Sequence, residues 1–272
     1  MLLRSITLVA LIMAAVSFLT GGLWAAVAAF ALWWLGLALL AFLFLVVVCR
    51  MVDLDKEQEE DDPFYRRVAG IYIEALVQSL QVRVKTSGLE KTPKDGRFLL
   101  VCNHQFVADP ALLLHFFKDS QLAFISKKEN RDMFCVGAIM HRLLCQCIDR
   151  EDDRQALQVI LKCIRIIKDN KASIAVFPEG STNHDDFLHP FRPGVFKIAQ
   201  KAQVPIVVCT LRNTRPIVHN GLRLKPTDVE LKLLEVIPAE SLKGRTAVDI
   251  SDQVYKLMAD DLGPDLIAKE EE

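Results

Sequence analysis

The sequence lacks an excess of charge of either sign: 33 Lys and Arg residues are balanced by 34 Asp and Glu residues, so the formal net charge of the 272-residue chain is −1. A nucleic-acid partner is therefore not expected, because binding one usually requires a basic surface. Charge is also absent from 45 consecutive positions, Ser5 to Cys49. No internal repeat of about 20–50 residues is present, which excludes a repeat array. The composition excludes disordered, collagen-like and coiled-coil chains.

The uncharged run is too long for one helix across a hydrocarbon core of about 30 Å, which takes about 20 residues. Thr20-Gly21-Gly22 divides it, so we expect a hairpin of two helices, about residues 2–19 and 23–49, within a membrane segment 1–52. Arg4 and Arg50 then flank one face, which the positive-inside rule makes cytoplasmic. A cleaved signal peptide is disfavoured because the apolar run continues far beyond any cleavage site. The sequence leaves open whether the hairpin spans the bilayer or re-enters from one leaflet.

After Arg50 the composition becomes that of a globular chain. Residues 53–62 are strongly acidic and form a linker, and residues 63–272 are enough for one cytoplasmic domain with its own core. The helical spacing of residues 63–79 predicts a helix that either lies along the membrane surface or packs on the core. The seven cysteines are odd in number and lie mostly in apolar runs, which favours reduced thiols. Cys145-Gln146-Cys147 has the wrong spacing for a zinc knuckle.

Short apolar runs alternate with longer amphipathic stretches along the domain. This alternation predicts an α/β fold with a mixed, mostly parallel sheet covered by helices. The expected strands are residues 80–86, 98–102, 122–126, 145–149, 173–177, 204–210 and 229–236, and the expected helices are 110–117, 154–168, 194–202 and 247–258.

Polar residues follow several of the expected strands, and in parallel sheets the ligand crevice lies outside the carboxyl ends of the strands. His104 and Asp109 lie five residues apart between a strand and a helix. The loop can fold back, so that Asp109 orients the imidazole and the other ring nitrogen acts as a base. A simpler interpretation is that Asp109 caps the helix before Pro110 and His104 is an ordinary loop histidine.

A second polar cluster, Glu179-Gly180-Ser181, follows another strand. Gly180 allows a ligand to approach the backbone, Ser181 can donate a hydrogen bond, and Glu179 can accept hydroxyl groups. Neither cluster has a serine or cysteine in a nucleophile-elbow pattern, which favours direct transfer over a covalent intermediate. A metal-dependent hydrolase that uses His104, Asp109 and Glu179 as ligands stays open as an alternative.

These patterns together resemble those of the glycerolipid acyltransferases, whose best-known members are the 1-acylglycerol-3-phosphate acyltransferases of phospholipid synthesis. The resemblance covers about residues 80–240, and four blocks in a fixed order are more specific than any single motif. The blocks comprise Asn103-His104-x4-Asp109, then Lys127-Lys128-Glu129 with Gly137 and Ile148-Asp149-Arg150, then Phe177-Pro178-Glu179-Gly180 with Phe191-Arg192-Pro193-Gly194, and finally Val204-Pro205-Ile206-Val207.

The resemblance implies transfer of a fatty acyl chain from a thioester, on coenzyme A or acyl carrier protein, to the hydroxyl of a lysolipid held in the membrane. The first expectation is 1-acylglycerol-3-phosphate, giving phosphatidic acid, with no metal and no cofactor beyond the thioester co-substrate. His104 would be the general base and Asp109 its orienter. The residues expected to bind substrate are Lys127, Lys128, Arg150, Glu179, Gly180, Ser181, Arg192, Val204 and Pro205.

One position departs from the family pattern. Members that act on lysophosphatidic acid commonly have an arginine two residues after the glycine of the third block, and here Gly180 and Ser181 are followed by Thr182. An arginine grips phosphate through two parallel bonds, which threonine cannot do. Either Lys128, Arg150 and Arg192 suffice for phosphate, or the acceptor is another lysophospholipid or a hydroxylated amino-acid lipid. A non-catalytic, membrane-anchored lipid-binding protein is a less favoured alternative.

Overall fold

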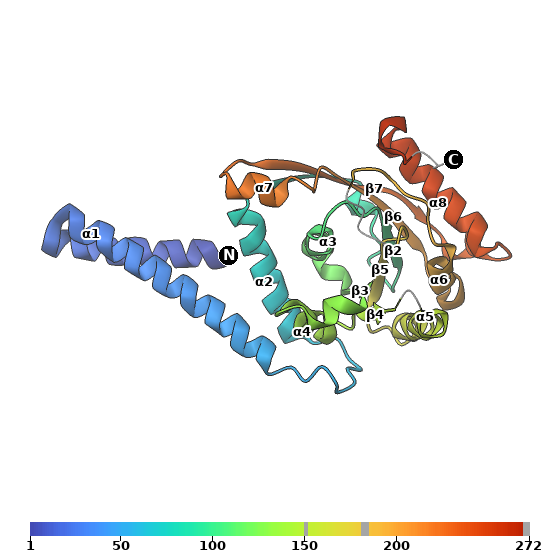
Figure 1. The fold of residues 1–272 in the computed structure, drawn as a ribbon, viewed down its shortest axis with the longest axis horizontal. Coiled ribbons are helices and arrows are strands. Elements are labelled where there is room, and N and C mark those ends of the chain that lie inside the picture. The colour runs from blue at the N-terminus through green and yellow to red at the C-terminus, as the bar shows by residue number, and fades with distance from the viewer. Residues whose placement is uncertain (150–151, 181–184, 269–272) are drawn as a thin grey trace.

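The computed structural model describes residues 1–149, 152–180 and 185–268. Its centre is a seven-stranded sheet with the order β1-β7-β6-β2-β5-β3-β4 (Figure 1). Described neighbours are parallel except β6 and β7, which are antiparallel. The mixed, mostly parallel sheet predicted from the sequence is therefore confirmed. The strands are β1 (Val82–Ser87), β2 (Leu99–Cys102), β3 (Leu122–Lys127), β4 (Gln146–Ile148), β5 (Ser173–Val176), β6 (Ile206–Arg212) and β7 (Thr227–Ile237).

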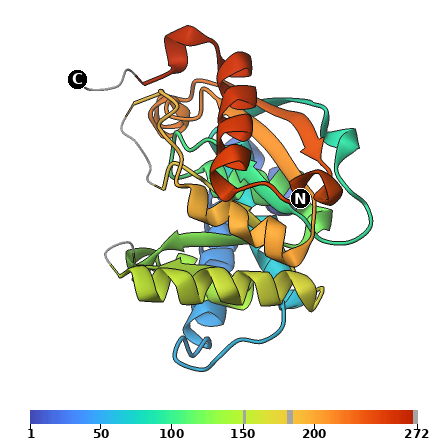
Figure 2. The same ribbon diagram turned by 90° about the vertical axis from the view of Figure 1, so that its right-hand side faces the viewer.

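Helices cover both faces of the sheet. Leu99 and Val101 of β2 join the core beneath one face, whereas Leu100 and Cys102 join the core beneath the other. Side chains alternate along a strand, so the continuous apolar run of β2 fills both cores. Figure 2 faces the layer formed by α5 (Asp153–Lys168), α6 (Lys197–Ala202) and α8 (Ala247–Leu262). The opposite layer contains α2 (Pro63–Ser79), α3 (Asp109–Phe116) and α4 (Val136–Arg142) (Figure 1).

A long apolar hairpin, α1 (Leu2–Arg50), projects from the domain (Figure 1). The helix is interrupted at Gly22, whose φ of 74° and ψ of −165° are accessible essentially only to glycine. This break falls within the expected turn, and the first limb returns to the domain. The two limbs are joined by a hydrogen bond from Trp34 Nε1 to Thr7 Oγ1 of 3.3 Å. By length and composition α1 is capable of crossing a membrane, and little of it is buried within the protein.

Helix α2 packs between the hairpin and the domain. Asp62 caps its first turn by accepting hydrogen bonds from the backbone N–H groups of Phe64 and Tyr65. Tyr65 and Val68 are buried, and the Tyr65 hydroxyl donates to the carbonyl of Val48 in α1 at 3.0 Å. The sequence predicted that residues 63–79 form a helix that either lies along the membrane surface or packs on the core. The structure shows a helix packed on the core.

The acidic linker is bound along the domain rather than extended into solvent. Its carboxylates pair with basic residues from four different segments of the domain, and Arg131 also binds the carbonyl of Leu54 at 3.0 Å. These pairs are Asp55–Arg131 (2.5 Å), Glu57–Lys162 (3.2 Å), Glu60–Lys171 (3.0 Å) and Asp62–Arg142 (3.8 Å). Exposed pairs contribute little individually, so the linker position depends on several acting together.

One further pair, Arg66–Asp61, is largely buried, with side chains 15% and 6% exposed. Arg66 binds Asp61 through two nitrogens and also donates to the carbonyl of Leu122 in β3 at 3.2 Å. We expect Arg66→Ala to lower the free energy of unfolding by about 3 kcal/mol, because it leaves a buried carboxylate unpaired. The measurement is the urea concentration at which half of the detergent-solubilised protein is unfolded. Arg67→Ala removes an exposed arginine from the next position and should leave the midpoint unchanged; an equal shift would contradict the argument.

Two short helices were not predicted from the sequence, α4 and α7 (Ile217–Leu222). Helices of six or seven residues make fewer than two turns and give no recognisable period. The expected helix 194–202 is also shorter, because Pro193–Phe196 forms a 3₁₀ turn before α6 begins.

Candidate active site

The loop after β2 places a histidine beside a buried carboxylate. His104 Nδ1 lies 2.9 Å from Asp109 Oδ2, and the same oxygen accepts the backbone N–H groups of Gln105 at 2.8 Å and Phe106 at 2.7 Å. The Asp109 side chain is 0% exposed and that of His104 is 13% exposed. Three donors on one oxygen fix the loop, so the imidazole is held with Nδ1 toward Asp109 and Nε2 on the opposite side of the ring.

Asp109 does not cap the following helix. Helix α3 begins at Asp109 itself, with Ala108 in the N-cap position and no side-chain cap bond. The helix-cap interpretation of Asp109 is therefore wrong. The carboxylate turns back toward the loop because three donors meet it there.

Aromatic stacking holds the His104 ring from one side. The ring lies 4.0 Å from that of Phe177, with an interplanar angle of 17°. Phe177 in turn stacks on Phe124 of β3, with ring centroids 6.1 Å apart. The imidazole is thus fixed by Asp109 at its edge and by Phe177 on its face, which limits the rotamers it can adopt.

Asn103 has a structural role that the sequence did not reveal. It is 2% exposed, and its side-chain amide donates to the carbonyl of Leu211 at 2.9 Å while its Oδ1 accepts the Leu211 N–H at 2.8 Å. The side chain thereby pairs with β6 where the backbone of β2 leaves the sheet. This pairing fixes the point at which the His104 loop begins.

Glu179 joins two loops through its carboxylate. Oε1 accepts the backbone N–H of His104 at 2.8 Å, and Oε2 accepts that of His189 at 3.1 Å. The residue is only 6% exposed. Backbone amides on both oxygens indicate a positioning role for Glu179, and its binding of substrate hydroxyl groups stays a prediction.

A second histidine–carboxylate pair borders the site and was missed in the sequence. His189 Nε2 lies 2.9 Å from Asp185 Oδ1, and both side chains are partly exposed. The neighbouring Asp186 accepts Gln105 Nε2 through its carbonyl at 3.4 Å. The only sequence signal was an aspartate four residues before a histidine, which is common by chance.

Gly180 lies directly beneath Arg192. The glycine has a φ of 79°, and a Cβ at this position would lie 2.8 Å from Arg192 Nε and 2.9 Å from Arg192 Cδ. The Arg192 backbone N–H also donates to the carbonyl of Pro178 at 2.8 Å. Glycine is therefore required at position 180 for both conformation and space, and it lets an exposed arginine approach the loop of Glu179.

The remaining predicted cations are only partly described. Lys127 ends β3 and is exposed at the same edge of the sheet as Glu179, since β3 and β5 are parallel neighbours. Lys128 forms an exposed ion pair with Asp149 at 3.2 Å. Arg150, Ser181 and Thr182 lie outside the described residues.

Val204 and Pro205 do not join this edge of the sheet. They precede β6, and the Pro205 carbonyl accepts the N–H of Leu99 at the start of β2. His104 follows the opposite end of β2, about 13 Å away for a four-residue strand. Val204 and Pro205 are therefore not next to His104, because the first residues of parallel strands lie at the edge away from their carboxyl ends, and their binding of substrate stays a prediction.

The described residues contain no group of three or more His, Cys, Asp or Glu side chains placed to hold a metal ion. His104, Asp109 and Glu179 therefore do not form the three-ligand metal site that the hydrolase alternative requires. Buried polar atoms remain at the base of the loop, where Asp109 Oδ1 and Gln105 Oε1 have no hydrogen-bond partner among the described residues. Two acceptors of this kind need a donor, which a buried water supplies in many proteins.

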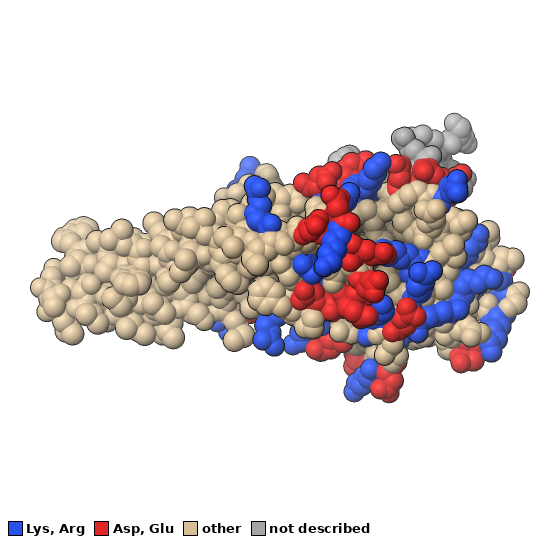
Figure 3. All heavy atoms as spheres, turned by 90° about the horizontal axis from the view of Figure 1, so that it is seen from below, with Lys and Arg blue, Asp and Glu red and all other residues tan. Residues whose placement is uncertain are grey.

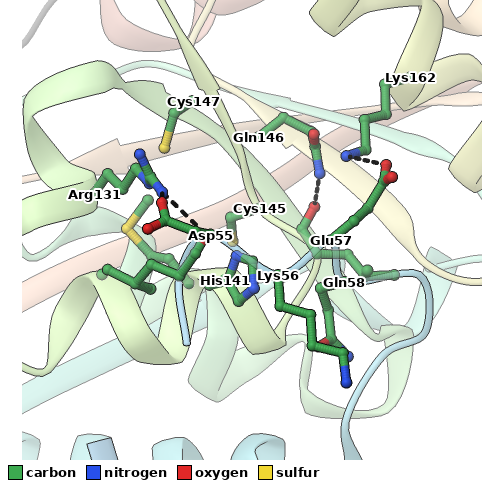
Figure 4. A pocket seen from close by; sticks show the side chains of 14 residues that line it. Asp55, Lys56, Glu57, Gln58, Arg131, His141, Cys145, Gln146, Cys147 and Lys162 are labelled. Carbon is green, nitrogen blue, oxygen red and sulfur yellow. Dashed lines mark hydrogen bonds and ion pairs between the residues drawn. The ribbon is translucent and has the colours of Figure 1, made fainter. Parts of the chain in front are cut away.

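A separate cavity of about 300 Å³ lies between the acidic linker, α4 and the edge strand β4 (Figure 4). Cys145 and Cys147 both line it, as the predicted strand alternation requires. Burial raises the pKa of the Cys145 thiol to about 12 and raises the pKa of Cys147 above its ordinary value. Both sulfurs are therefore protonated near neutral pH, which suits structural thiols rather than nucleophiles.

The comparisons with known proteins agree with this geometry. Residues 83–212 match the sequence family described as Acyltransferase. A chloroplastic 1-acyl-sn-glycerol-3-phosphate acyltransferase of Brassica napus is 32% identical over 162 residues, which make up 58% of this chain and 46% of that protein. The 1-acyl-sn-glycerol-3-phosphate acyltransferase of Saccharomyces cerevisiae is 26% identical over 186 residues, 67% of this chain and 61% of that protein. The chain thus spans about half to three-fifths of the length of these relatives.

The fold is also that of a solved structure. The 1-acyl-sn-glycerophosphate acyltransferase PlsC from Thermotoga maritima superposes with a TM-score of 0.61 over 84% of this chain and 89% of that chain, at 23% identity. The fold and the site together define the class of this domain: an α/β domain with a His–Asp pair at the carboxyl edge of its sheet. Residues 83–212 are similar in sequence to the Acyltransferase family, which the motif blocks also resemble.

Proposed function

We propose that the protein transfers a fatty acyl chain from an acyl thioester to the hydroxyl of a lysolipid, with 1-acylglycerol-3-phosphate as the acceptor and phosphatidic acid as the product. The observation that carries the proposal is the His104–Asp109 pair, held at 2.9 Å at the carboxyl edge of the sheet. The names of the relatives and of PlsC support the acceptor.

His104 acts as the general base in this proposal. Asp109 sets the proton on Nδ1, so Nε2 is the nitrogen that takes the proton of the acceptor hydroxyl. The acceptor oxygen attacks the thioester carbonyl carbon, a C–O bond forms and the C–S bond breaks. The proton on His104 then passes to the departing sulfur, which leaves as the thiol of coenzyme A or acyl carrier protein. The two substrates react directly in this proposal, because neither polar cluster of the sequence has a serine or cysteine in a nucleophile-elbow pattern.

Arg192 supplies positive charge for the acceptor phosphate. Its side chain contacts Gly180 next to the loop of Glu179, and no ion pair holds its guanidinium within the described part of the chain. It can therefore replace the family arginine for which this sequence has Thr182. Lys127 and Lys128 at the end of β3 add positive charge for the phosphate or for the thioester carrier.

Arg192→Ala is expected to raise the KM for lysophosphatidic acid by about 10- to 100-fold, because a charge-assisted hydrogen bond contributes about 1.5–3 kcal/mol. The value of kcat should change little if the contact forms equally in the ground and transition states. Lys197→Ala, which removes another exposed cation, is the control. A KM that is unchanged, or that rises equally for a monoacylglycerol without phosphate, would contradict the role of Arg192.

The hairpin places the site at the membrane, where acceptor and product reside. Both ends of α1 meet the domain: the N-terminal amino group lies 2.6 Å from Glu74 Oε1, and Tyr65 binds the carbonyl of Val48. Arg4 and Arg50 accordingly flank the base of the hairpin, which supports a domain on the cytoplasmic face of the membrane. Anchoring there raises the effective concentration of a membrane-bound acceptor.

The test is acyl transfer by the detergent-solubilised full chain from a labelled acyl thioester, supplied on coenzyme A or on acyl carrier protein. Lysophosphatidic acid is compared with zwitterionic and amino-acid lysolipids. Transfer to lysophosphatidic acid is expected. Transfer only to another acceptor would retain the mechanism and overturn the acceptor, in keeping with Thr182, and no transfer to any acceptor would overturn the function.

A further inference from the structure

Helix α7 and the turn after it expose apolar side chains that no other part of the chain covers in the described structure. Leu222 is 79% exposed and Leu224 is 77% exposed, and Val218 of α7 is 41% exposed. Arg223 and Lys225 alternate with the leucines, are exposed, and form no ion pair with the described residues. These five residues are called the α7 surface below.

The turn that carries the leucines is well held. Lys225 N–H donates to the carbonyl of Asn220 at 2.9 Å, and Leu224 N–H donates to that of Gly221 at 3.0 Å. Leu224 has a φ of 53°, a left-handed conformation that few branched residues adopt. The chain thus keeps two leucines in solvent by means of a defined turn, which indicates an interaction surface.

The α7 surface lies beside the base of the hairpin. Gly221 packs against Leu80 at the end of α2, where a Cβ at position 221 would lie 2.5 Å from Leu80 Cδ2. Glu74 of α2, which binds the N-terminus of α1, is six residues earlier, about 9 Å along a helix. The first limb of the hairpin and α7 therefore meet the C-terminal half of α2, whereas the end of the second limb meets the first turn of α2 (Figure 1).

The charge distribution fits a membrane surface at the junction between the hairpin and the domain. On the face that Figure 3 shows, the hairpin carries no charged side chain along its length, and Lys and Arg occur where it joins the domain, with Asp and Glu beside them on the domain. When the apolar hairpin enters a bilayer, its base and the neighbouring α7 surface come to the level of the head groups. Leucines that alternate with cations bind there through acyl chains and lipid phosphates.

We propose that the α7 surface is a second membrane contact, which inserts Leu222 and Leu224 into an anionic bilayer and binds lipid phosphates with Arg223 and Lys225. A single hairpin leaves the domain able to turn about the hairpin axis, whereas a second contact removes that freedom. Only four residues separate the end of β6 from α7, and β6 is parallel to β2, which leads to His104. The contact thus fixes the edge of the sheet that carries His104 relative to the membrane, and this last step rests on the proposed function.

Brominated lipids test the contact without any activity measurement. All three tryptophans, Trp24, Trp33 and Trp34, lie in the hairpin, so replacing them with Phe gives a background without tryptophan in which Leu222→Trp is the only reporter. The matched control is Leu161→Trp on α5, a position that is 55% exposed. The full chain is reconstituted into vesicles of phosphatidylcholine and phosphatidylglycerol in equal parts, with or without bromine on the acyl chains.

We expect bromine to quench the reporter at position 222 at least twofold and to leave the reporter at 161 unquenched. Quenching at 222 should weaken when Arg223 and Lys225 are both replaced by Gln, or when phosphatidylglycerol is omitted. The absence of quenching at 222, or equal quenching at both positions, would overturn the proposal. A blue shift at 222 that depends on protein concentration rather than on lipid would overturn it in favour of a second copy of the chain.

A second variant uses the natural tryptophans and measures kinetics. Leu222→Asp combined with Leu224→Asp should raise the KM for a long-chain acceptor in vesicles at least fivefold and leave the KM for a short-chain, monomeric acceptor unchanged. Leu157→Asp combined with Leu161→Asp on α5 should change neither. Equal effects on both acceptors would overturn the orienting role. If the unmodified protein transfers no acyl chain, the proposed function fails, while the quenching experiment still decides the membrane contact.

Discussion

The His104→Ala variant is expected to transfer acyl chains about 10²–10⁴-fold more slowly than the unmodified protein, which is the usual contribution of a general base. The acceptor hydroxyl is a weak nucleophile while it keeps its proton, and the imidazole is held in place to remove it. Because Asp109 and Phe177 fix the ring independently of substrate, the loss should appear in kcat rather than in KM.

The measurement is a rate of labelled product formation at saturating acceptor, with thermal unfolding followed in parallel. His104 is 13% exposed and packs on Phe177, so its removal should lower the unfolding temperature, and the rates are compared at a temperature at which the variant stays folded. His115→Ala, which removes a histidine from α3 outside the site, provides the control for general effects of such a change. Transfer at an unchanged rate by His104→Ala would remove the histidine from the mechanism and, with it, the role given to Asp109.

The sequence predicted this pair because its geometry is local. His104 and Asp109 are five residues apart, and a short loop between a buried strand and a helix can bring them together without help from the rest of the chain. The fold class was predictable for a similar reason, since alternating strand and helix periods act within each segment. Gly180 was predicted to let a ligand approach the backbone, which stays a prediction, whereas the structure shows the side chain of Arg192 against it.

The missed features depend on contacts between distant segments. Asn103 pairs with Leu211, which is 108 residues further along the chain, and no local pattern records that partner. The α7 surface is recognisable only once its leucines are seen to be exposed beside the hairpin. Val204 and Pro205 were assigned to the site from their place in a motif, but a motif does not state at which edge of the sheet its residues lie. The contacts of Glu179 with the His104 and His189 loops also join distant segments. They are the basis of the prediction for Glu179→Ala that follows.

The Glu179→Ala variant is expected to lose about 3 kcal/mol or more of unfolding free energy and to slow acyl transfer by about 10²-fold. Both carboxylate oxygens accept backbone N–H groups in a buried place, and hydrogen bonds to a charged group contribute about 1.5–3 kcal/mol each. Without the carboxylate, the amides of His104 and His189 lack this acceptor, and the His104 loop loses one of its fixed points. A small displacement of a catalytic base is enough for a loss of this size.

Glu179→Gln separates positioning of the loop from binding of substrate. The amide retains the size of the carboxylate but offers one oxygen and one NH₂ group, so one of the two backbone N–H groups meets a donor instead of an acceptor. A positioning role predicts that kcat falls while the KM for the acceptor stays within about twofold. Glu129→Gln, at an exposed carboxylate after β3, should change neither value. A selective rise in KM with kcat unchanged would instead assign Glu179 to the acceptor hydroxyl. The two loops would then have to be held together by other contacts, such as the hydrogen bond from Gln105 Nε2 to the Asp186 carbonyl.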